Sequence, residues 1–242
     1  MSVFPPSPSE NDEWVSVADL MSGLMLLFLA IAVFFMIQIE NTRGDLENIA
    51  VLYEELQTGL YGQLQSEFAA DLESWNAEID SMTLSVRFLE QEVLFEAGEA
   101  ELNEQFTTIL ADFFPRYVGV LTSADYRDHI SEVRIEGHTS SDWIDLNGLE
   151  AYEANMRLSQ ERTRTVLGFV VRLPSVTDVW DSWLRERLTA NGLSSSKLVV
   201  VGGVEDRDQS RRVEFRIRTD AEEQMDAILR RISSGDTAVT AR

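Results

Sequence analysis

An uncharged apolar run of 18 residues, positions 20–37, is the feature that most constrains how this chain can fold. Only Ser22 and Gly23 interrupt it, and a few further residues on its N-terminal side give enough helix to cross a hydrocarbon layer of ~30 Å. Residues 1–13 contain no Lys or Arg and carry three acids, whereas a signal peptide begins with a positively charged region and ends at a small-residue cleavage site. We therefore predict an uncleaved membrane helix over 14–39.

Asp19 is the only charged residue within that predicted helix. A charge inside a bilayer costs a few kcal/mol or more, so such a residue usually faces a partner or a wet path rather than lipid. Ser22 and Gly23 follow three and four residues later on the same helix face, where small side chains let another helix approach. Two interpretations stay open. One is an ion-conducting or partner-facing carboxylate with Ser22 beside it; the other is an interfacial acid favoured by the dipole of the helix N-terminus.

The charge and composition of the chain exclude several classes of function. The chain has 42 acidic and 20 basic residues, a formal net charge of −22, whereas nucleic acids and anionic lipids are bound by clustered Lys and Arg. It has no Cys, so disulfides and thiol chemistry are excluded. No nucleophile–base pair or Gly-rich phosphate loop is present, and His138 is accompanied only by His129. We predict neither an enzyme, nor a bound cofactor, nor a metal site.

Apolar residues recur every three or four positions from Leu46 to Met82, which is the spacing of a helical stripe. The spacing predicts a helical linker over 40–82, although Gly59 and Gly62 weaken it and allow a break. A long helix with one apolar stripe needs a surface to pack on. We expect that surface to be a second copy of the chain, the alternative being that the stripe folds back on its own domain.

Strand and helix patterns alternate over residues 83–233, which predicts one α+β domain made of a mixed sheet with helices on one face. Pro115 is expected to break or bend one helix, and Asn191-Gly192 to stop another. Residues 234–242 are expected to form a disordered tail. The predicted strands are 84–89, 130–139, 197–203 and 211–219, and the predicted helices are 98–121, 155–173, 176–188 and 221–232.

Three short motifs occur in this domain in the order found in a known family: Gly137-His138-Thr139, then Asn155-x-x-Leu158-Ser159-x-x-Arg162, then Arg211-Arg212-Val213-Glu214-Phe215. Together they resemble the OmpA-like peptidoglycan-binding domain, and the likeness covers roughly residues 84–219. No single motif is decisive, but the ordered set is specific.

The resemblance implies a binding site for the diaminopimelate stem of peptidoglycan. In that reading Arg162 binds a carboxylate, for which a guanidinium fork is suited, and Asn155 and Leu158 shape the wall. The family has Asp, the ammonium contact, at the position where this chain has Ser140. Asp142, or alternatively Asp145, is the candidate replacement in a longer loop.

The N-terminal helix carries a second resemblance. Trp14 followed by Ala18-Asp19-Leu20-Met21-Ser22 is similar to the MotB-type stator subunits, whose single helix holds a proton-carrying Asp. Within that family, the short acidic tail, the long helical segment and the Gly-His-Thr-Ser turn are most like the ZorB family, the motor subunits of Zorya antiphage systems.

The stator resemblance implies a non-enzymatic subunit of an ion-driven motor in the bacterial inner membrane. It implies a cytoplasmic tail over 1–13, a periplasmic C-terminal domain, and a homodimer inside a ring of MotA-like, or ZorA-like, multi-helix subunits. The carried ion would be H⁺ or Na⁺. A passive membrane-to-peptidoglycan tether and a TolR- or ExbD-like energiser are the alternatives.

Overall fold

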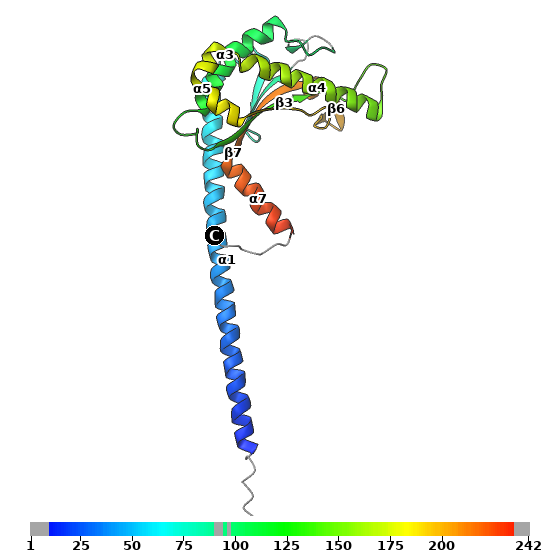
Figure 1. Ribbon diagram of the computed structural model, residues 1–242. Coiled ribbons are helices and arrows are strands. Elements are labelled where there is room, and N and C mark those ends of the chain that lie inside the picture. Colours follow the sequence, from blue (N-terminus) through cyan, green and yellow to red (C-terminus); the bar gives the residue numbers. More distant parts are fainter. Residues whose placement is uncertain (1–9, 90–93, 96–97, 235–242) are drawn as a thin grey trace, which may run out of the picture. The chain divides into compact units, whose positions relative to one another are not determined.

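The computed structural model describes residues 10–89, 94–95 and 98–234, and the chain divides into two units, 1–49 and 50–242. Helix α1 (Glu10–Phe68) begins in the first unit and ends in the second (Figure 1). Its segment Val17–Glu40 has a mean hydropathy of 2.7, none of it is buried, and by length and composition it can cross a membrane. The predicted apolar, membrane-length helix is confirmed.

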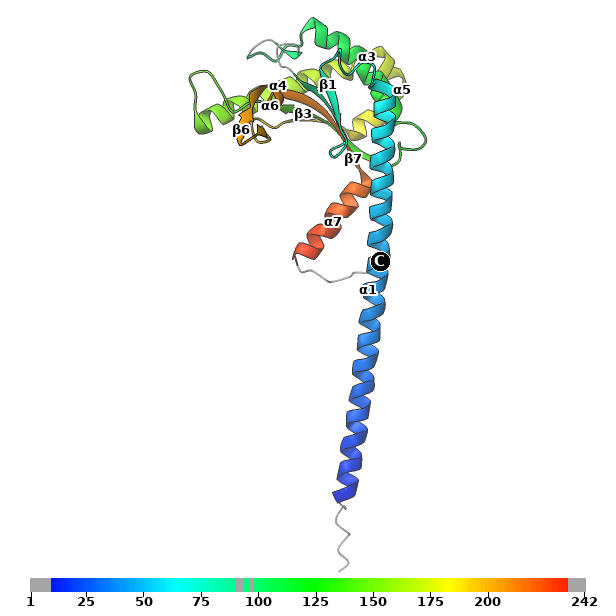
Figure 2. The ribbon, with the colours of Figure 1, turned by 180° about the vertical axis from the view of Figure 1, so that it is seen from behind.

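The second unit is built on a five-stranded mixed sheet in the order β1-β2-β7-β3-β4. All neighbouring strands are antiparallel except β3 and β4, which are parallel. Helices α3, α4 and α5 lie over one face of this sheet, as Figures 1 and 2 show, and α7 follows β7. The predicted fold class, a membrane-length helix followed by an α+β domain, is confirmed. The bounds are β1 Ala77–Asp80, β2 Ser85–Leu89, α3 Glu104–Leu121, β3 Ile130–His138, α4 Gly148–Val170, α5 Pro174–Arg187, β4 Leu188–Gly192, β5 Val199–Val201, β6 Val204–Asp206, α6 Arg207–Ser210, β7 Arg212–Thr219 and α7 Asp220–Ser234.

The core of the second unit lies between the sheet and the helices that cover it. Alternate residues of the strands face it, among them Val86 and Phe88 on β2 and Phe215 on β7, all fully buried. Phe113 on α3 is the centre of an aromatic cluster, with ring centroids 5.0 Å from Phe88 and 5.1 Å from Phe215. Each buried aromatic removes a large apolar area from water, so this cluster contributes a major part of the domain's stability.

The apolar stripe predicted over 46–82 packs differently from expectation. Helix α1 passes through both glycines unbroken but ends at Phe68, and β1 begins at Ala77, so the predicted helical segment 40–82 is too long. The stripe residues of α1 that are buried in the core of the second unit are Leu56, Leu60, Leu64 and Phe68. This part of the stripe therefore folds back on its own domain, because its apolar face is covered by the core rather than left for a second copy. Self-association of the chain stays a prediction.

Several predicted boundaries are also corrected. Helix α3 begins at Glu104 rather than at residue 98, because the Asn103 side chain accepts the backbone N–H of Gln105 and caps it. Pro115 lies inside this one helix without ending it, and α4 begins seven residues earlier than predicted. The predicted strand 197–203 contributes β5 to a separate two-stranded hairpin with β6.

Gly192 is a strand residue and not the helix stop that its sequence suggests. Strand β4 pairs with β3 in parallel, and a Cβ on Gly192 would lie 2.6 Å from Gln160 Cα on α4. A Cβ on the neighbouring Gly137 would lie 2.9 Å from the carbonyl oxygen of Ser159. Glycine at both positions therefore lets the α4 backbone lie directly on the ends of β3 and β4.

We expect Gly192→Ala to lower the free energy of unfolding by about 1–3 kcal/mol, because the added methyl group meets backbone atoms that cannot move aside. Gly62→Ala is the matched control, since no atom lies within 4 Å of a Cβ there and alanine favours the helix by up to about 1 kcal/mol. Urea unfolding of the detergent-solubilised chain measures both. A Gly192→Ala chain as stable as the parent would contradict the close packing of α4.

Candidate functional site

Asp19 is exposed on α1, three residues before Ser22. The Ser22 hydroxyl donates to the backbone carbonyl of Ala18 at 2.8 Å, so it is held along its own helix. A Cβ on Gly23 would meet no atom within 4 Å in this chain, which leaves this face open to another helix. The structure thus places Asp19, Ser22 and Gly23 together on one accessible stretch of helix.

The start of α1 bears on the alternative interpretation of Asp19. The helix begins at Glu10, nine residues upstream, which is about 14 Å along the axis at a rise of about 1.5 Å per residue. The favourable field of a helix N-terminus fades within its first turn. The dipole therefore gives no stabilisation to a carboxylate at position 19, and one physical argument for a merely interfacial acid is removed.

The turn after β3, the turn after β4 and one face of α4 are joined by hydrogen bonds. The backbone N–H of Thr139 donates to the Ser194 carbonyl at 3.0 Å, and the Ser194 N–H donates to the Ser159 hydroxyl at 3.0 Å. The Ser194 hydroxyl donates to the Tyr152 carbonyl at 2.9 Å. These buried contacts hold the predicted binding residues of α4 over the carboxyl ends of two parallel strands.

Arg162 is buried at the centre of this region, with 3% of its surface exposed. Its Nε donates to the Glu99 carbonyl at 2.7 Å, and its guanidinium lies 4.7 Å from the centre of the Phe95 ring. Burial, reinforced by the charge of Arg211, lowers the pKa of Arg162 to about 10, so it remains charged at neutral pH. The space that Arg162 lines with Phe95 and His138 leaves no room for a water molecule.

The other predicted peptidoglycan contacts divide between buried and exposed positions. Asn155 is buried, and its amide donates to the backbone carbonyl of Asp142 at 3.1 Å. The carboxylate of Asp142 is exposed and pairs with Arg207 Nε at 2.8 Å. Ser140 is buried and Leu158 is half-buried.

An open cavity of about 440 Å³ lies beside these residues, and Asp142 is the one predicted site residue that lines it. Its other walls are residues that the motif analysis did not select, among them Trp143, Asn147, Tyr152 and Ser195. Asp145 is exposed with a φ of +61° and does not line the cavity, so of the two candidate acids Asp142 is the better placed. The sequence signal for this cavity was the longer polar loop between the first two motifs.

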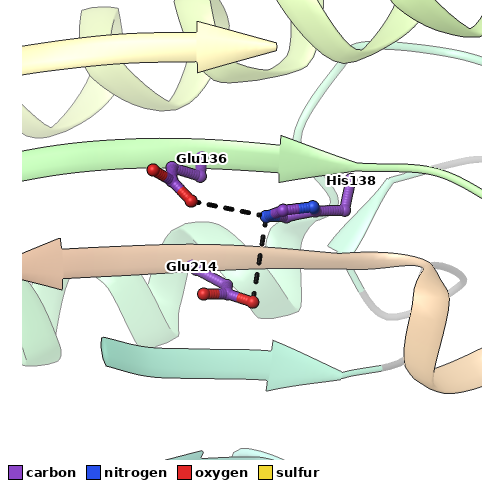
Figure 3. A group of neighbouring side chains, drawn as sticks. All are labelled: Glu136, His138 and Glu214. Carbon is purple, nitrogen blue, oxygen red and sulfur yellow. Dashed lines mark ion pairs between the residues drawn. The ribbon is translucent and has the colours of Figure 1, made fainter. Parts of the chain in front are cut away.

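A second cluster of charged groups lies on the sheet itself. His138, which lies within the predicted strand 130–139, is the last residue of β3 and is buried between Glu136 on β3 and Glu214 on β7 (Figure 3). Its Nε2 lies 3.6 Å from a Glu136 carboxylate oxygen and 3.8 Å from one of Glu214. Glu136 and Glu214 are direct cross-strand neighbours, so the imidazole separates two like charges.

These three side chains have donor atoms within 4.8 Å of one another, a spacing that a metal ion could bridge. The surrounding charges oppose that use. The same Glu214 oxygen already pairs with Arg212 Nε at 2.5 Å and with Arg87 Nε at 3.2 Å, and two guanidinium groups repel a further cation. The donor set therefore favours a buried ion-pair network that ties β2, β7 and β3 together.

This network predicts a specific acid dependence. Burial alone raises the pKa of Glu136, but His138, Arg216 and Arg134 together outweigh it and hold the pKa below the ordinary value of 4.5. A carboxyl group whose pKa is lowered by folding stabilises the folded state above pH 4.5. This stabilisation is lost as the pH falls through the pKa of the group in the folded state. We expect Glu136→Gln to flatten the fall in unfolding free energy below pH 4.5.

The measurement is chemical denaturation of the detergent-solubilised chain at a series of pH values from 7 down to about 3. Glu186→Gln, which removes an exposed carboxylate on α5, is the control and should leave the slope as in the parent. An unchanged slope in Glu136→Gln would show that the network does not hold Glu136 ionised.

The chain is similar in sequence to two curated proteins. It is 43% identical over 228 residues to the Zorya protein ZorB of Escherichia coli strain Crooks, covering 93% of this chain and 96% of that protein. It is 26% identical over 225 residues to a Zorya protein ZorB of a second Escherichia coli strain, covering 87% and 81%. No protein-family model matches the chain.

Among solved structures, a putative MotB-like protein from Desulfovibrio vulgaris aligns with 24% identity and a TM-score of 0.47, covering 68% of this chain and 95% of that one. The class is set by the chain's own features, which in the described residues are one membrane-length apolar helix followed by an α+β domain with a mixed sheet. Within that class, identity over nearly the whole length places the chain in the ZorB family.

Proposed function

We propose that this protein is the ion-conducting, peptidoglycan-anchored subunit of an ion-driven membrane motor of the Zorya type. Two copies place their membrane helices inside a ring of MotA-like multi-helix subunits. Their N-termini are cytoplasmic and their α+β domains are periplasmic, where they grip the cell wall. The protein itself is not an enzyme, and rotation of the ring signals phage attack to cytosolic effectors.

Asp19 is the residue that most strongly supports this proposal. It is the only charge between residues 14 and 39, and it shares an open helix face with two small residues. A lone carboxylate at such a position can bind and release a proton while a partner shields it from lipid. Membership in the ZorB family supports a stator- or anchor-type role for a chain that carries this residue.

The energetics of the proposed step are adequate for mechanical work. Moving one elementary charge through the membrane potential releases about 2.3 kcal/mol per 100 mV. Protonation neutralises Asp19 on one copy at a time, which changes the contacts of that helix with the ring. Because the pair of helices is pinned through its domains to the wall, the ring turns around it.

The anchor function uses the α4 face. The candidate contacts are Arg162, Asn155, Leu158, Ser140 and Asp142. Arg162 lies in a closed space with its Nε on the Glu99 carbonyl, so a stem-peptide carboxylate reaches the guanidinium only once that contact opens. A guanidinium fork suits a carboxylate, and a hydrogen bond between two ionised partners is roughly twice as strong as one between neutral groups.

We expect Asp19→Asn to insert into the membrane and assemble with its ring partner, yet to lose every activity that depends on the membrane potential. Asparagine keeps the size and hydrogen-bonding capacity of the side chain but cannot change charge. Phage protection and ion flux in cells measure the loss, and co-purification measures assembly. Glu40→Gln, at the other end of the apolar segment, is the control that should retain activity.

Full activity of the Asp19→Asn chain would identify a passive tether. Failure of that variant to assemble would make Asp19 a structural contact, and the motor proposal would lose its central residue.

We expect Arg162→Lys to weaken binding to purified sacculi at least tenfold, because lysine keeps the charge but cannot form a two-pronged contact with a carboxylate. Arg164→Lys, at an exposed position of the same helix, is the matched control and should bind as the parent does. Co-sedimentation of the detergent-solubilised chain with sacculi is the measurement. Equal binding by the Arg162 variant and the parent would remove this residue from the site.

A further inference from the structure

The C-terminal turns of α1 are held in the second unit by directional contacts as well as by the apolar core. The buried residues of these turns, among them Leu60, Leu64 and Phe68, seat the helix against the core. Apolar contacts are non-directional, so they specify the angular setting of a helix less sharply than hydrogen bonds and ion pairs, whose donors and acceptors must meet in one geometry. Polar contacts of these turns therefore decide how firmly α1 is fixed in rotation.

Arg116 on α3 closes the end of α1. Its Nη2 donates to the backbone carbonyl of Glu67 at 2.7 Å, and its Nε donates to the Glu67 carboxylate at 2.7 Å. This carbonyl is one of the last four of the helix, and the N–H of Asp71, four residues later, donates to the Phe68 carbonyl instead. Nη2 also pairs with the Asp71 carboxylate at 2.9 Å, and the guanidinium lies 4.9 Å from the centre of the Phe68 ring. One side chain therefore binds the last turn through its backbone, a carboxylate and a ring.

A second set of contacts holds α1 about three turns earlier. The Gln57 side-chain amide donates to the backbone carbonyls of Ser81 at 2.7 Å and Met82 at 3.2 Å, in the turn between β1 and β2. The hydroxyl of Tyr126, from the segment after α3, lies 2.8 Å from the point that a Cβ on Gly59 would occupy. The two sets of contacts lie about 15 Å apart along the helix at a rise of about 1.5 Å per residue. Because they come from different elements, together they resist both rotation of α1 about its axis and sliding along it.

The place of these contacts in the chain gives them a mechanical meaning. Helix α1 runs without interruption from the membrane-length segment to Phe68, so a torque or pull applied to that segment enters the domain through these turns. We propose that the C-terminal turns of α1 form a load-bearing joint, in which Arg116 and Gln57 are positioning residues that keep the membrane helix from turning or slipping against the wall-bound domain. The inference rests on the proposed motor function and extends it from ion transfer to the transmission of force.

The joint predicts local loosening of α1 when either positioning residue is changed. Arg116→Gln removes the charge that binds the helix end, and Gln57→Glu keeps the size of the side chain but replaces its donor with an oxygen that faces two carbonyl oxygens. In the detergent-solubilised full chain, we expect each change to speed backbone hydrogen exchange of residues 57–68 at least about tenfold and to leave that of β7 as in the parent. Arg185→Gln removes an exposed ion pair on α5 and is the control that should leave both rates unchanged.

The same variants test the transmission of force in cells. We expect Arg116→Gln and Gln57→Glu to assemble, to bind sacculi and to conduct ions under a membrane potential as the parent does, because Asp19 and the α4 face are untouched. Both variants should nevertheless lose phage protection. Ion flux without protection is the mark of a slipping joint, since a general loss of folded protein lowers flux and protection together.

The outcomes separate the joint from the motor. Hydrogen exchange at the parent's rate in both variants overturns the joint, and so does full phage protection by both. Loss of flux together with protection also overturns it, because the two residues would then act on assembly or stability. If Arg116→Gln fails to fold, Gln57→Glu still decides, since it contacts a different element. A parent chain without ion flux under a membrane potential overturns the proposed motor and the joint with it, whereas the other results overturn the joint alone.

Discussion

The contact between the α4 backbone and the ends of β3 and β4 is the constraint on which the rest of the candidate site depends. A Cβ at Gly137 or Gly192 would lie closer to α4 main-chain atoms than van der Waals contact allows. The helix can therefore occupy its place only because both residues are glycine. That contact fixes where Ser159 meets Ser194. It also fixes the height at which Asn155 and Arg162 lie over the sheet.

The two parts of the chain differ in how their charged side chains are paired. In the α+β domain, buried charge is neutralised internally, because the Glu214 carboxylate pairs with Arg212 and Arg87. In the membrane-length helix, Asp19 is exposed and its own chain offers it no cation within the apolar segment Val17–Glu40. A carboxylate in that position depends on protonation or on another subunit, which is the physical basis of the proposed motor.

The α4 region also separates two kinds of pocket that the family resemblance had merged into one site. Arg162 is stacked on Phe95 and hydrogen-bonded to Glu99, and its surroundings are closed. The neighbouring cavity is open, and Asp142 contributes to it together with Trp143.

The sequence by itself determined the features that depend on local periodicity and on composition. The apolar run 20–37 predicts a membrane-length helix, because within lipid a helix satisfies every backbone group of the segment itself. The alternating patterns of β2, β3 and β7 likewise determined three strands, since a sheet with one buried face imposes a period of two.

The tertiary structure decided the features that depend on partners distant in the chain. From the sequence, the apolar stripe favoured a second copy of the chain over the chain's own core. Only the tertiary structure showed that Leu60 and Leu64 belong to the core of the second unit. Asn191-Gly192 has the local signature of a helix stop, yet pairing with β3 made it a strand end. Arg162 could be identified as a site candidate from its motif, but whether its guanidinium is displayed or buried depends on a loop some 60 residues away, which no local pattern records.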